Sequence, residues 1–450
     1  MNTRTETPHR SAAAVIAMCF VAIVFDGYDL VVYGAITPAL LNYEPWGMTP
    51  VTTGAIGSLA LAGMFFGAIL IGYLTDVVGR RKVLIVSIAF FSILMVLSAC
   101  APTPGVFGFS RFLAGLGLGG VIPTAIAMTI EFSPAHRRNF NNALMFSGYA
   151  VGGVLAALLS LALLENIGFR GMLAIGAAPL IFVVPLLFKY LPESPAFLKN
   201  RGRVAEAEVI SRAYGLEQAE DSSNSQAVPD EPAESNRYRM IFTGKLLPAT
   251  IFFCIAGIAG QTLVYGLNTW LPQLMVAANY SLASSLSFLL TVNAGAVAGV
   301  LISSRLADRY GPRIVTVVSF VCAGAALLLM ATGAMPLIVT YLLVAILGFG
   351  SVGAQILING FLGTYYPGRV RATALGLMLG VGRIGAVIAI YGGGVLVAAS
   401  LSTFANFSVW AIAAVAGLVA ILLIPRRKKR EIAKETSHQA TLPSPNTSKK

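Results

Sequence analysis

The stretch GYLTDVVGRR at residues 72–81 recurs as SRLADRYGPR at residues 304–313. Asp76 thereby matches Asp308 at an offset of 308 minus 76, or 232. Agreement at several places along the chain predicts a duplicated protein whose two halves share one fold. Offsets of 232 or 233 relate these further pairs: Tyr33-Gly34 and Tyr265-Gly266, GLGLGG (115–120) and GFGSVG (348–353), Pro134 and Pro367, Arg138 and Arg371, and Gly152 and Gly385.

The composition around these repeats is typical of a membrane protein. Of the 450 residues, 56% are hydrophobic and 11% are charged, whereas soluble domains carry roughly 25% charged residues. The net charge is +12, but the positive residues stand in short turns between apolar stretches and in the tail. This pattern indicates membrane topology rather than nucleic-acid binding. The four cysteines stand inside apolar stretches at irregular spacing, which favours neither disulfides nor a metal site.

Apolar stretches long enough to cross a bilayer, about 20 residues or more, occur twelve times. We therefore expect an all-α membrane protein with twelve transmembrane helices in two pseudo-symmetric six-helix bundles. The first stretch is too long and too acidic for a cleaved signal peptide, so we expect it to remain as the first helix. The twelve stretches cover about 13–41, 53–75, 83–101, 104–132, 141–164, 171–190, 246–276, 283–304, 314–332, 336–365, 371–398 and 403–424.

A polar segment that contains EQAEDSSNSQAVPDEPAES separates the sixth stretch from the seventh. Its mixed charges predict a solvated linker. The predicted organisation is an N-terminal bundle over 1–190, a cytoplasmic linker over 191–245, a C-terminal bundle over 246–424 and a basic cytoplasmic tail over 425–450.

Cationic residues gather on one side of the predicted membrane protein. With the N-terminus inside, the turns at 80–82, 137–138, 305–313 and 369–371 and the RRKKR run at 426–430 all face the cytoplasm. The outer loops then keep only Arg170. Because inner loops are enriched in Lys and Arg, we expect a multi-pass protein of the cell inner membrane with both termini in the cytoplasm.

Two carboxylates, Asp26 and Asp29, stand in the otherwise apolar stretch CFVAIVFDGYDLVVYGAITPALL at 19–41. A charged side chain at the bilayer centre costs about 2.5–3.5 kcal/mol, so both must face protein or water. At i and i+3 they share one helix face, where burial and mutual repulsion favour the protonated form. We interpret the pair as a proton-coupling site; the alternative is that arginines hold both residues in structural ion pairs.

Three segments resemble motifs of the major facilitator superfamily. The stretch at 72–81 resembles its loop motif G-x-L-x-D-x-x-G-R-[RK], and RFLAGLGLGG at 111–120 resembles its fourth-helix motif R-x-x-x-G-x-x-x-G. LPESPAFL at 191–198 resembles P-E-S-P-R-[YF]-L, with Ala196 in place of the arginine. The fold that this resemblance implies is the same twelve-helix arrangement.

The DGYD sequence at 26–29, continuing as DLVVYG, resembles the aromatic acid:proton symporter family of that superfamily. The resemblance covers nearly the whole chain apart from the tails and linker. It implies import of a benzoate-like or hydroxybenzoate-like anion together with protons, by alternating access. It also implies functional charges at Asp26, Asp29, Arg111, Glu131, Asp308, Arg371 and Arg383.

Charged residues at the cytoplasmic helix ends are candidates for gating, since ion pairs that form and break there can bias which side is open. Glu131, close in sequence to Arg137 and Arg138, is either a gate residue or a second proton carrier beside the two aspartates. The gating candidates are Asp76, Arg80, Arg138, Asp308 and Arg371.

The predicted substrate site contains two arginines. Arg111 stands about seven residues inside its span, which favours an interior role over snorkelling to the interface. Arg383 stands twelve residues beyond Arg371 and is expected to bind the substrate carboxylate, or an aspartate when the site is empty. Tyr33, like Tyr149 and Trp270, either stacks on the substrate ring or packs in the core. Polar residues at helical spacing complete the predicted substrate-binding set: Gln261, Tyr265, Asn268, Gln355 and Asn359.

Other functions have little support in the sequence. There is no G-x-x-x-x-G-K-[ST] loop for ATP-driven transport, and the three histidines stand in tails or loops, so we expect neither an enzyme nor a catalytic, metal or cofactor site. The linker and tail are too short and polar for a sensor's signalling domain. Transport of another organic anion or a sugar-like metabolite, or efflux, remains an alternative. The expected partners are the aromatic acid, protons and the bilayer, without nucleic acid, for a monomeric protein.

Overall fold

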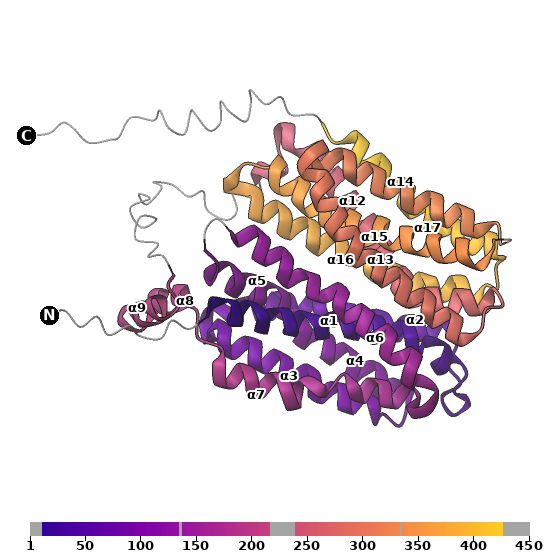
Figure 1. Ribbon diagram of the computed structural model, residues 1–450, viewed down its shortest axis with the longest axis horizontal. Coiled ribbons are helices and arrows are strands. Elements are labelled where there is room, and N and C mark those ends of the chain that lie inside the picture. The colour runs from indigo at the N-terminus through magenta and orange to yellow at the C-terminus, as the bar shows by residue number, and fades with distance from the viewer. Residues whose placement is uncertain (1–10, 135–136, 217–238, 334, 426–450) are drawn as a thin grey trace, which may run out of the picture.

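The computed structural model describes residues 11–134, 137–216, 239–333 and 335–425, and the regular structure in these ranges is helical. A few side chains inside them, including that of Asp76, are outside the description. The helices form two bundles that lie side by side, the first in indigo to magenta and the second in orange to yellow (Figure 1).

The first bundle contains the helices that precede the linker. The predicted span 104–132 is broken after Leu118 into α4 and α5, which follow one another as a single crossing. α6 bends at Gly168, where φ is +66°. The helices are α1 (Ala12–Leu41), α2 (Pro50–Val78), α3 (Arg80–Ala99), α4 (Pro104–Leu118), α5 (Val121–Glu131), α6 (Arg138–Ile175) and α7 (Ala178–Tyr190).

The second bundle contains six long helices. Within the described residues, 11 helical segments are long and apolar enough to cross a membrane, and one of them, Phe140–Tyr190, has 51 residues and includes the bend at Gly168. Because about 20 residues cross a bilayer, this segment accounts for two spans. The twelve-helix prediction is confirmed. The helices are α12 (Leu247–Ala277), α13 (Leu282–Tyr310), α14 (Pro312–Ala331), α15 (Leu337–Tyr365), α16 (Gly368–Ala398) and α17 (Thr403–Leu423).

The packing of the helices repeats as the sequence does. In the first bundle α1 packs on α6 and α2 on α4, and in the second bundle the equivalent helices pack as α12 on α16 and α13 on α15. Between the bundles, α2 packs on α16 and the equivalent α13 packs on α6. The predicted pseudo-symmetry of the two bundles is therefore present in their contacts.

The predicted linker is partly helical. It contains α8 (Pro195–Asn200) and α9 (Val204–Ala213), and the hydroxyl of Ser194 caps α8 by accepting a hydrogen bond from the Phe197 amide at 3.1 Å. Residues 217–238 of the linker and residues 426–450 of the predicted basic tail lie outside the described residues.

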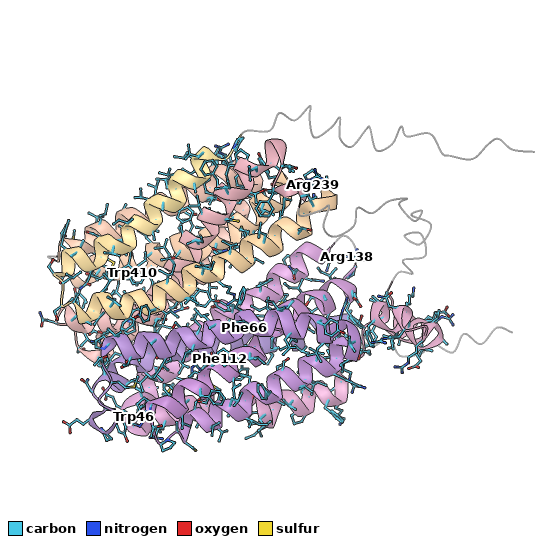
Figure 2. The ribbon with its side chains drawn as sticks, turned by 180° about the vertical axis from the view of Figure 1, so that it is seen from behind. Trp46, Phe66, Phe112, Arg138, Arg239 and Trp410 are labelled. Carbon is cyan, nitrogen blue, oxygen red and sulfur yellow. The ribbon has the colours of Figure 1, made fainter. Side chains whose placement is uncertain are left out.

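The two ends of the molecule differ in how closely the bundles approach. Figure 2 shows Trp46 and Trp410 at one end, here named the Trp46 end, and Arg138 and Arg239 at the other, the Arg138 end. The ribbons of the two bundles diverge toward the Arg138 end (Figure 2). Toward the Trp46 end they touch through backbone, because a side-chain carbon on Gly34 of α1 would lie only 1.9 Å from the Asn268 carbonyl oxygen of α12.

Two further glycines extend this contact between α2 and α16. A side-chain carbon on Gly54 would lie 2.8 Å from the Ile390 carbonyl oxygen, and one on Gly394 would lie 2.3 Å from the Pro50 carbonyl oxygen. Distances this short leave no room for any side chain, since even one added methyl group must displace a backbone. The bundles are thus closed against each other at the Trp46 end.

Replacing Gly34 with valine should hold the bundles apart at the Trp46 end, because the added carbon atoms collide with the α12 backbone. Thr269, which is fully buried beside Gly34, serves as reporter when it is changed to cysteine in a chain whose four native cysteines are replaced by serine. We expect a water-soluble maleimide to label the introduced thiol several-fold faster in the Gly34→Val background than in the parent.

The matched control is Gly72→Ala, because nothing lies within 4 Å of an added carbon at Gly72. The thermal unfolding midpoint of each variant, measured in the same detergent, separates local opening from unfolding. Equal labelling rates in Gly34→Val and Gly72→Ala would show that the glycine contact does not close this end.

Candidate functional site

A cavity with about 360 Å³ of empty space lies between the bundles, at the level of the two intramembrane aspartates. Only a small part of it is wide enough for water, so a ligand ring enters only if the surrounding helices move apart. The polar lining consists of Asp26, Asp29, Tyr33, Arg111, Tyr149, Tyr265 and Thr269.

Asp29 of α1 is neutralised inside the first bundle. Both terminal nitrogens of Arg111 on α4 donate to its carboxylate: Nη1 to Oδ1, and Nη2 to Oδ2 at 3.1 Å. The exposed fractions of the two residues are 4% and 2%. The Arg111 guanidinium also stands 5.3 Å from the centre of the Tyr33 ring, and its Nη1 contacts the Met95 sulfur at 3.5 Å. A bidentate, fully buried pair of this kind fixes both side chains.

Asp26, one helical turn before Asp29, has a different environment. It is 2% exposed, and its Oδ2 atom has no hydrogen-bond partner among the described residues. The nearest opposite charge is Arg383 on α16 of the other bundle, which attracts the carboxylate without coming within the 4.0 Å of an ion pair. Asp29 is therefore ion-paired within its own bundle, whereas the counter-charge of Asp26 lies on the other bundle.

Arg383 is held by the cavity wall. Its Nη1 donates to the hydroxyl of Tyr265 at 2.9 Å and contacts the Met64 sulfur at 3.7 Å, and its guanidinium stands 5.8 Å from the centre of the Tyr265 ring. Among the described residues, its other donors make no hydrogen bond. Several N–H groups of a planar cation are thus left for an anion at the edge of the cavity.

The glycine of the DGYD sequence sets the position of Tyr149. A side-chain carbon on Gly27 would lie 2.0 Å from the Tyr149 carbonyl oxygen, so α1 and α6 cross here in backbone contact. The neighbouring Tyr28 points the other way and donates its hydroxyl to the Met172 carbonyl at 2.8 Å. The inner two residues of DGYD therefore join the helices, and the outer two line the cavity.

The predicted aromatic and amide residues are distributed over several places. Tyr33 lines the cavity and donates to the Thr53 carbonyl at 2.6 Å, whereas Trp270 donates to the Ile390 carbonyl at 2.8 Å and packs outside the cavity lining. The four predicted amides also lie outside this lining: Gln261, Asn268, Gln355 and Asn359. Arg383 is not part of the lining either, but it contacts the lining residues Met64 and Tyr265.

Three of these four amides have hydrogen-bond partners. Asn268 accepts a hydrogen bond from Nδ2 of Asn293 at 2.9 Å, next to the Gly34 contact at the Trp46 end. Gln355 donates to Asn359 at 3.5 Å, and its Oε1 atom is buried without a described partner. Among the predicted polar residues of α12 and α15, only Tyr265 lines the cavity.

Glu131 lies in a cluster of polar residues at the Arg138 end, away from the cavity. It forms an ion pair with Arg80 at the start of α3 and accepts a hydrogen bond from the hydroxyl of Ser194 at 2.5 Å. The adjacent Glu193 accepts from the backbone amide of Arg81 at 3.0 Å. Glu131 thus joins α5, α3 and the start of α8, which is the geometry of a latch.

The other gating candidates are spread over the same end. Arg138 donates from Nε to the Ser133 carbonyl at 3.5 Å, while Asp308 and Arg371 are exposed. The side chain of Asp76 lies outside the described residues. These residues stay predictions for gating.

Three residues in or next to the site were not predicted from the sequence. Met64 places its sulfur atom against the half-buried Arg383, and Met95 places its sulfur atom against the buried Arg111. Nothing in an apolar stretch distinguishes these methionines from core residues. Asn293, which donates to Asn268, was also not predicted, although a polar amide in the middle of a span indicates an interior position.

Comparison with known proteins gives consistent relatives. The model of the Major Facilitator Superfamily matches residues 19–390 and 287–448. The benzoate transport protein of Acinetobacter baylyi is 37% identical, with 92% of this chain and 90% of the relative covered. The gentisate transporter of Corynebacterium glutamicum is 37% identical, with 93% and 88% covered, and the 4-hydroxybenzoate transporter PcaK of Pseudomonas aeruginosa is 31% identical, with 85% and 85% covered.

Solved structures show the same fold. The inward open conformation of the xylose transporter XylE from E. coli has a TM-score of 0.76 at 17% sequence identity, with 95% of this chain and 99% of that chain covered.

The two aspartates should differ in what they contribute to stability. Asp29→Asn leaves Arg111 buried without its counter-charge, which costs about 3–5 kcal/mol in other buried pairs, whereas Asp26→Asn breaks no ion pair. We expect the thermal unfolding midpoint in detergent to fall markedly for Asp29→Asn and little for Asp26→Asn.

The double variant Asp29→Asn/Arg111→Gln tests the same pair from both sides. It should recover much of the lost midpoint, because two neutral amides replace the two buried charges. Equal losses for the two aspartate variants, or no recovery in the double variant, would contradict the assignment of the ion pair.

Proposed function

Because the chain belongs to the Major Facilitator Superfamily, among relatives named for the transport of benzoate, gentisate and 4-hydroxybenzoate, we propose that it imports a benzoate-type or hydroxybenzoate-type acid together with protons. It is a multi-pass membrane transporter and not an enzyme. The observation that carries the mechanism is the difference between Asp29, paired within its bundle, and Asp26, open toward Arg383.

The orientation in the inner membrane follows from the distribution of positive charge. The Arg138 end carries most of the arginine-rich turns, so it faces the cytoplasm and both termini lie inside. The Trp46 end then faces outward, and the glycine contacts there keep it closed. In this orientation, a substrate would leave toward the cytoplasm when the bundles separate at the Arg138 end.

Arg383 binds the substrate carboxylate in this proposal. Its free N–H groups offer the planar, bidentate geometry that carboxylates prefer. The hydrogen bond from its Nη1 to the Tyr265 hydroxyl orients the guanidinium. The ring of the acid lies among the apolar residues of the cavity, including Leu61, Met64 and Ile390.

Asp26 couples this binding to protons. When Asp26 is ionised it competes with the substrate anion for Arg383, since two unit charges about 4 Å apart attract by roughly 4 kcal/mol at an effective dielectric constant of 20. A proton taken up from the outside neutralises Asp26 and leaves Arg383 to the anion. After the substrate has left, Asp26 releases the proton to the cytoplasm and pairs again with Arg383.

Glu131 is a gate residue rather than a second proton carrier in this mechanism. Its bonds to Arg80 and Ser194 lie at the Arg138 end, outside the cavity. They fix α3, α5 and α8 relative to one another while the bundles rock.

Uptake into proteoliposomes under an imposed acid-outside gradient tests the proposal. We expect Asp26→Asn to abolish accumulation of labelled benzoate-type acids but to keep counterflow exchange, because exchange needs binding without net proton movement. Arg383→Ala should raise the half-saturating concentration at least about tenfold, since a charge-assisted hydrogen bond contributes roughly 1.5–3 kcal/mol.

Arg212→Ala, an exposed change on α9, is the control and should behave as wild type. Wild-type accumulation by Asp26→Asn would remove the proton site from the proposal. Accumulation only when the gradient is reversed in right-side-out vesicles would show that the protein is an efflux carrier.

A further inference from the structure

Two unpartnered polar atoms meet in the cavity. Asp26 Oδ2 and the hydroxyl of Tyr149 are both buried, both belong to residues that line the cavity, and neither has a hydrogen-bond partner among the described residues. Buried polar groups in folded proteins are almost always hydrogen-bonded. Two exceptions on residues that line one cavity indicate a place that a polar group of a ligand completes.

The backbone brings the two residues together. α1 and α6 cross in contact at Gly27 and Tyr149, and Asp26 directly precedes Gly27. The Tyr149 hydroxyl interacts electrostatically with Asp26, Arg383 and Tyr265, and it lies close to the Tyr265 hydroxyl outside hydrogen-bond geometry. Because the crossing leaves no room for a side chain on Gly27, the two helices hold the backbones of Asp26 and Tyr149 close together.

We propose that Asp26 and Tyr149 form a subsite for a hydroxyl group on the ring of the transported acid, and that Tyr149 determines preference for hydroxylated over bare rings. A phenolic hydroxyl donates one hydrogen bond and accepts another. It donates to Asp26 Oδ2 and accepts from the Tyr149 hydroxyl, so one substituent satisfies both atoms. The inference rests on the proposed function, in which Arg383 holds the carboxylate of the same molecule.

Other substituents fit this subsite less well. A second carboxylate would be buried here without a counter-charge, because Arg383 already holds the first, and a bare ring edge leaves both polar atoms without a hydrogen bond from the ligand. Sites built to hydrogen-bond a substrate hydroxyl reject the analogue without it far more strongly than apolar pockets reject a missing methylene group. The chemical class assigned to the site is therefore the ring-hydroxylated aromatic acids.

Counterflow in proteoliposomes tests the subsite, since exchange does not depend on net proton movement. Labelled benzoate is exchanged in competition with unlabelled benzoate and with 2-, 3- and 4-hydroxybenzoate. In the wild-type protein we expect at least one hydroxybenzoate isomer to compete at about tenfold lower concentration than benzoate. In Tyr149→Phe that isomer should compete only at the concentration that benzoate needs, while the competing concentration of benzoate itself changes less than about twofold.

Tyr28→Phe is the matched control, because it removes the same hydroxyl from a buried tyrosine that bonds to Met172 outside the cavity. Its ratio of hydroxybenzoate to benzoate competition should equal that of the wild type. Benzoate competing as well as every hydroxybenzoate in the wild type, or an unchanged ratio in Tyr149→Phe, would overturn the subsite while aromatic-acid transport stands. Failure of all four acids to exchange would overturn the proposed function itself.

Discussion

The placement of negative charge inside a membrane-spanning bundle is the constraint on which the site depends. A buried carboxylate needs a counter-charge or a proton, and the two aspartates of α1 meet this need differently. Asp29 has Arg111 within its own bundle, so its charge is balanced in every arrangement of the two halves. Asp26 is attracted to Arg383 on the other bundle, so the compensation of its charge depends on how the bundles are placed relative to each other. Charge state and conformation are thereby linked at one residue.

The contacts between the bundles show how that dependence arises. Backbone-to-backbone contact at Gly34, Gly54 and Gly394 closes the Trp46 end. The pseudo-symmetric pairs α2 with α16 and α6 with α13 provide equivalent surfaces on which the halves can rock. Because Asp26 and Arg383 lie on opposite sides of this interface, any rocking changes the distance between them. Asp29 and Arg111, on α1 and α4 of one bundle, move together.

Much of this arrangement was predictable from the sequence. The rest was not predictable, and the reason is physical. Charges in apolar stretches are rare and costly, so Asp26, Asp29, Arg111 and Arg383 could be placed in the interior from the sequence alone. Their pairing could not, because side chains at i and i+3 share a face and either aspartate could reach either arginine. Gln261 and Asn268 share one face of α12 with Tyr265, but at about 1.5 Å of rise per residue they stand at other heights along the helix, and only Tyr265 lines the cavity.

The most direct test of Asp26 as the coupling group is the proton balance of substrate binding. A benzoate-type acid is added to purified protein in weakly buffered detergent near neutral pH, and a pH indicator follows the protons bound. The mechanism predicts uptake of about one proton per substrate bound by the wild type, the same uptake by Asp29→Asn/Arg111→Gln, and none by Asp26→Asn. Equal proton uptake by wild type and Asp26→Asn would contradict it.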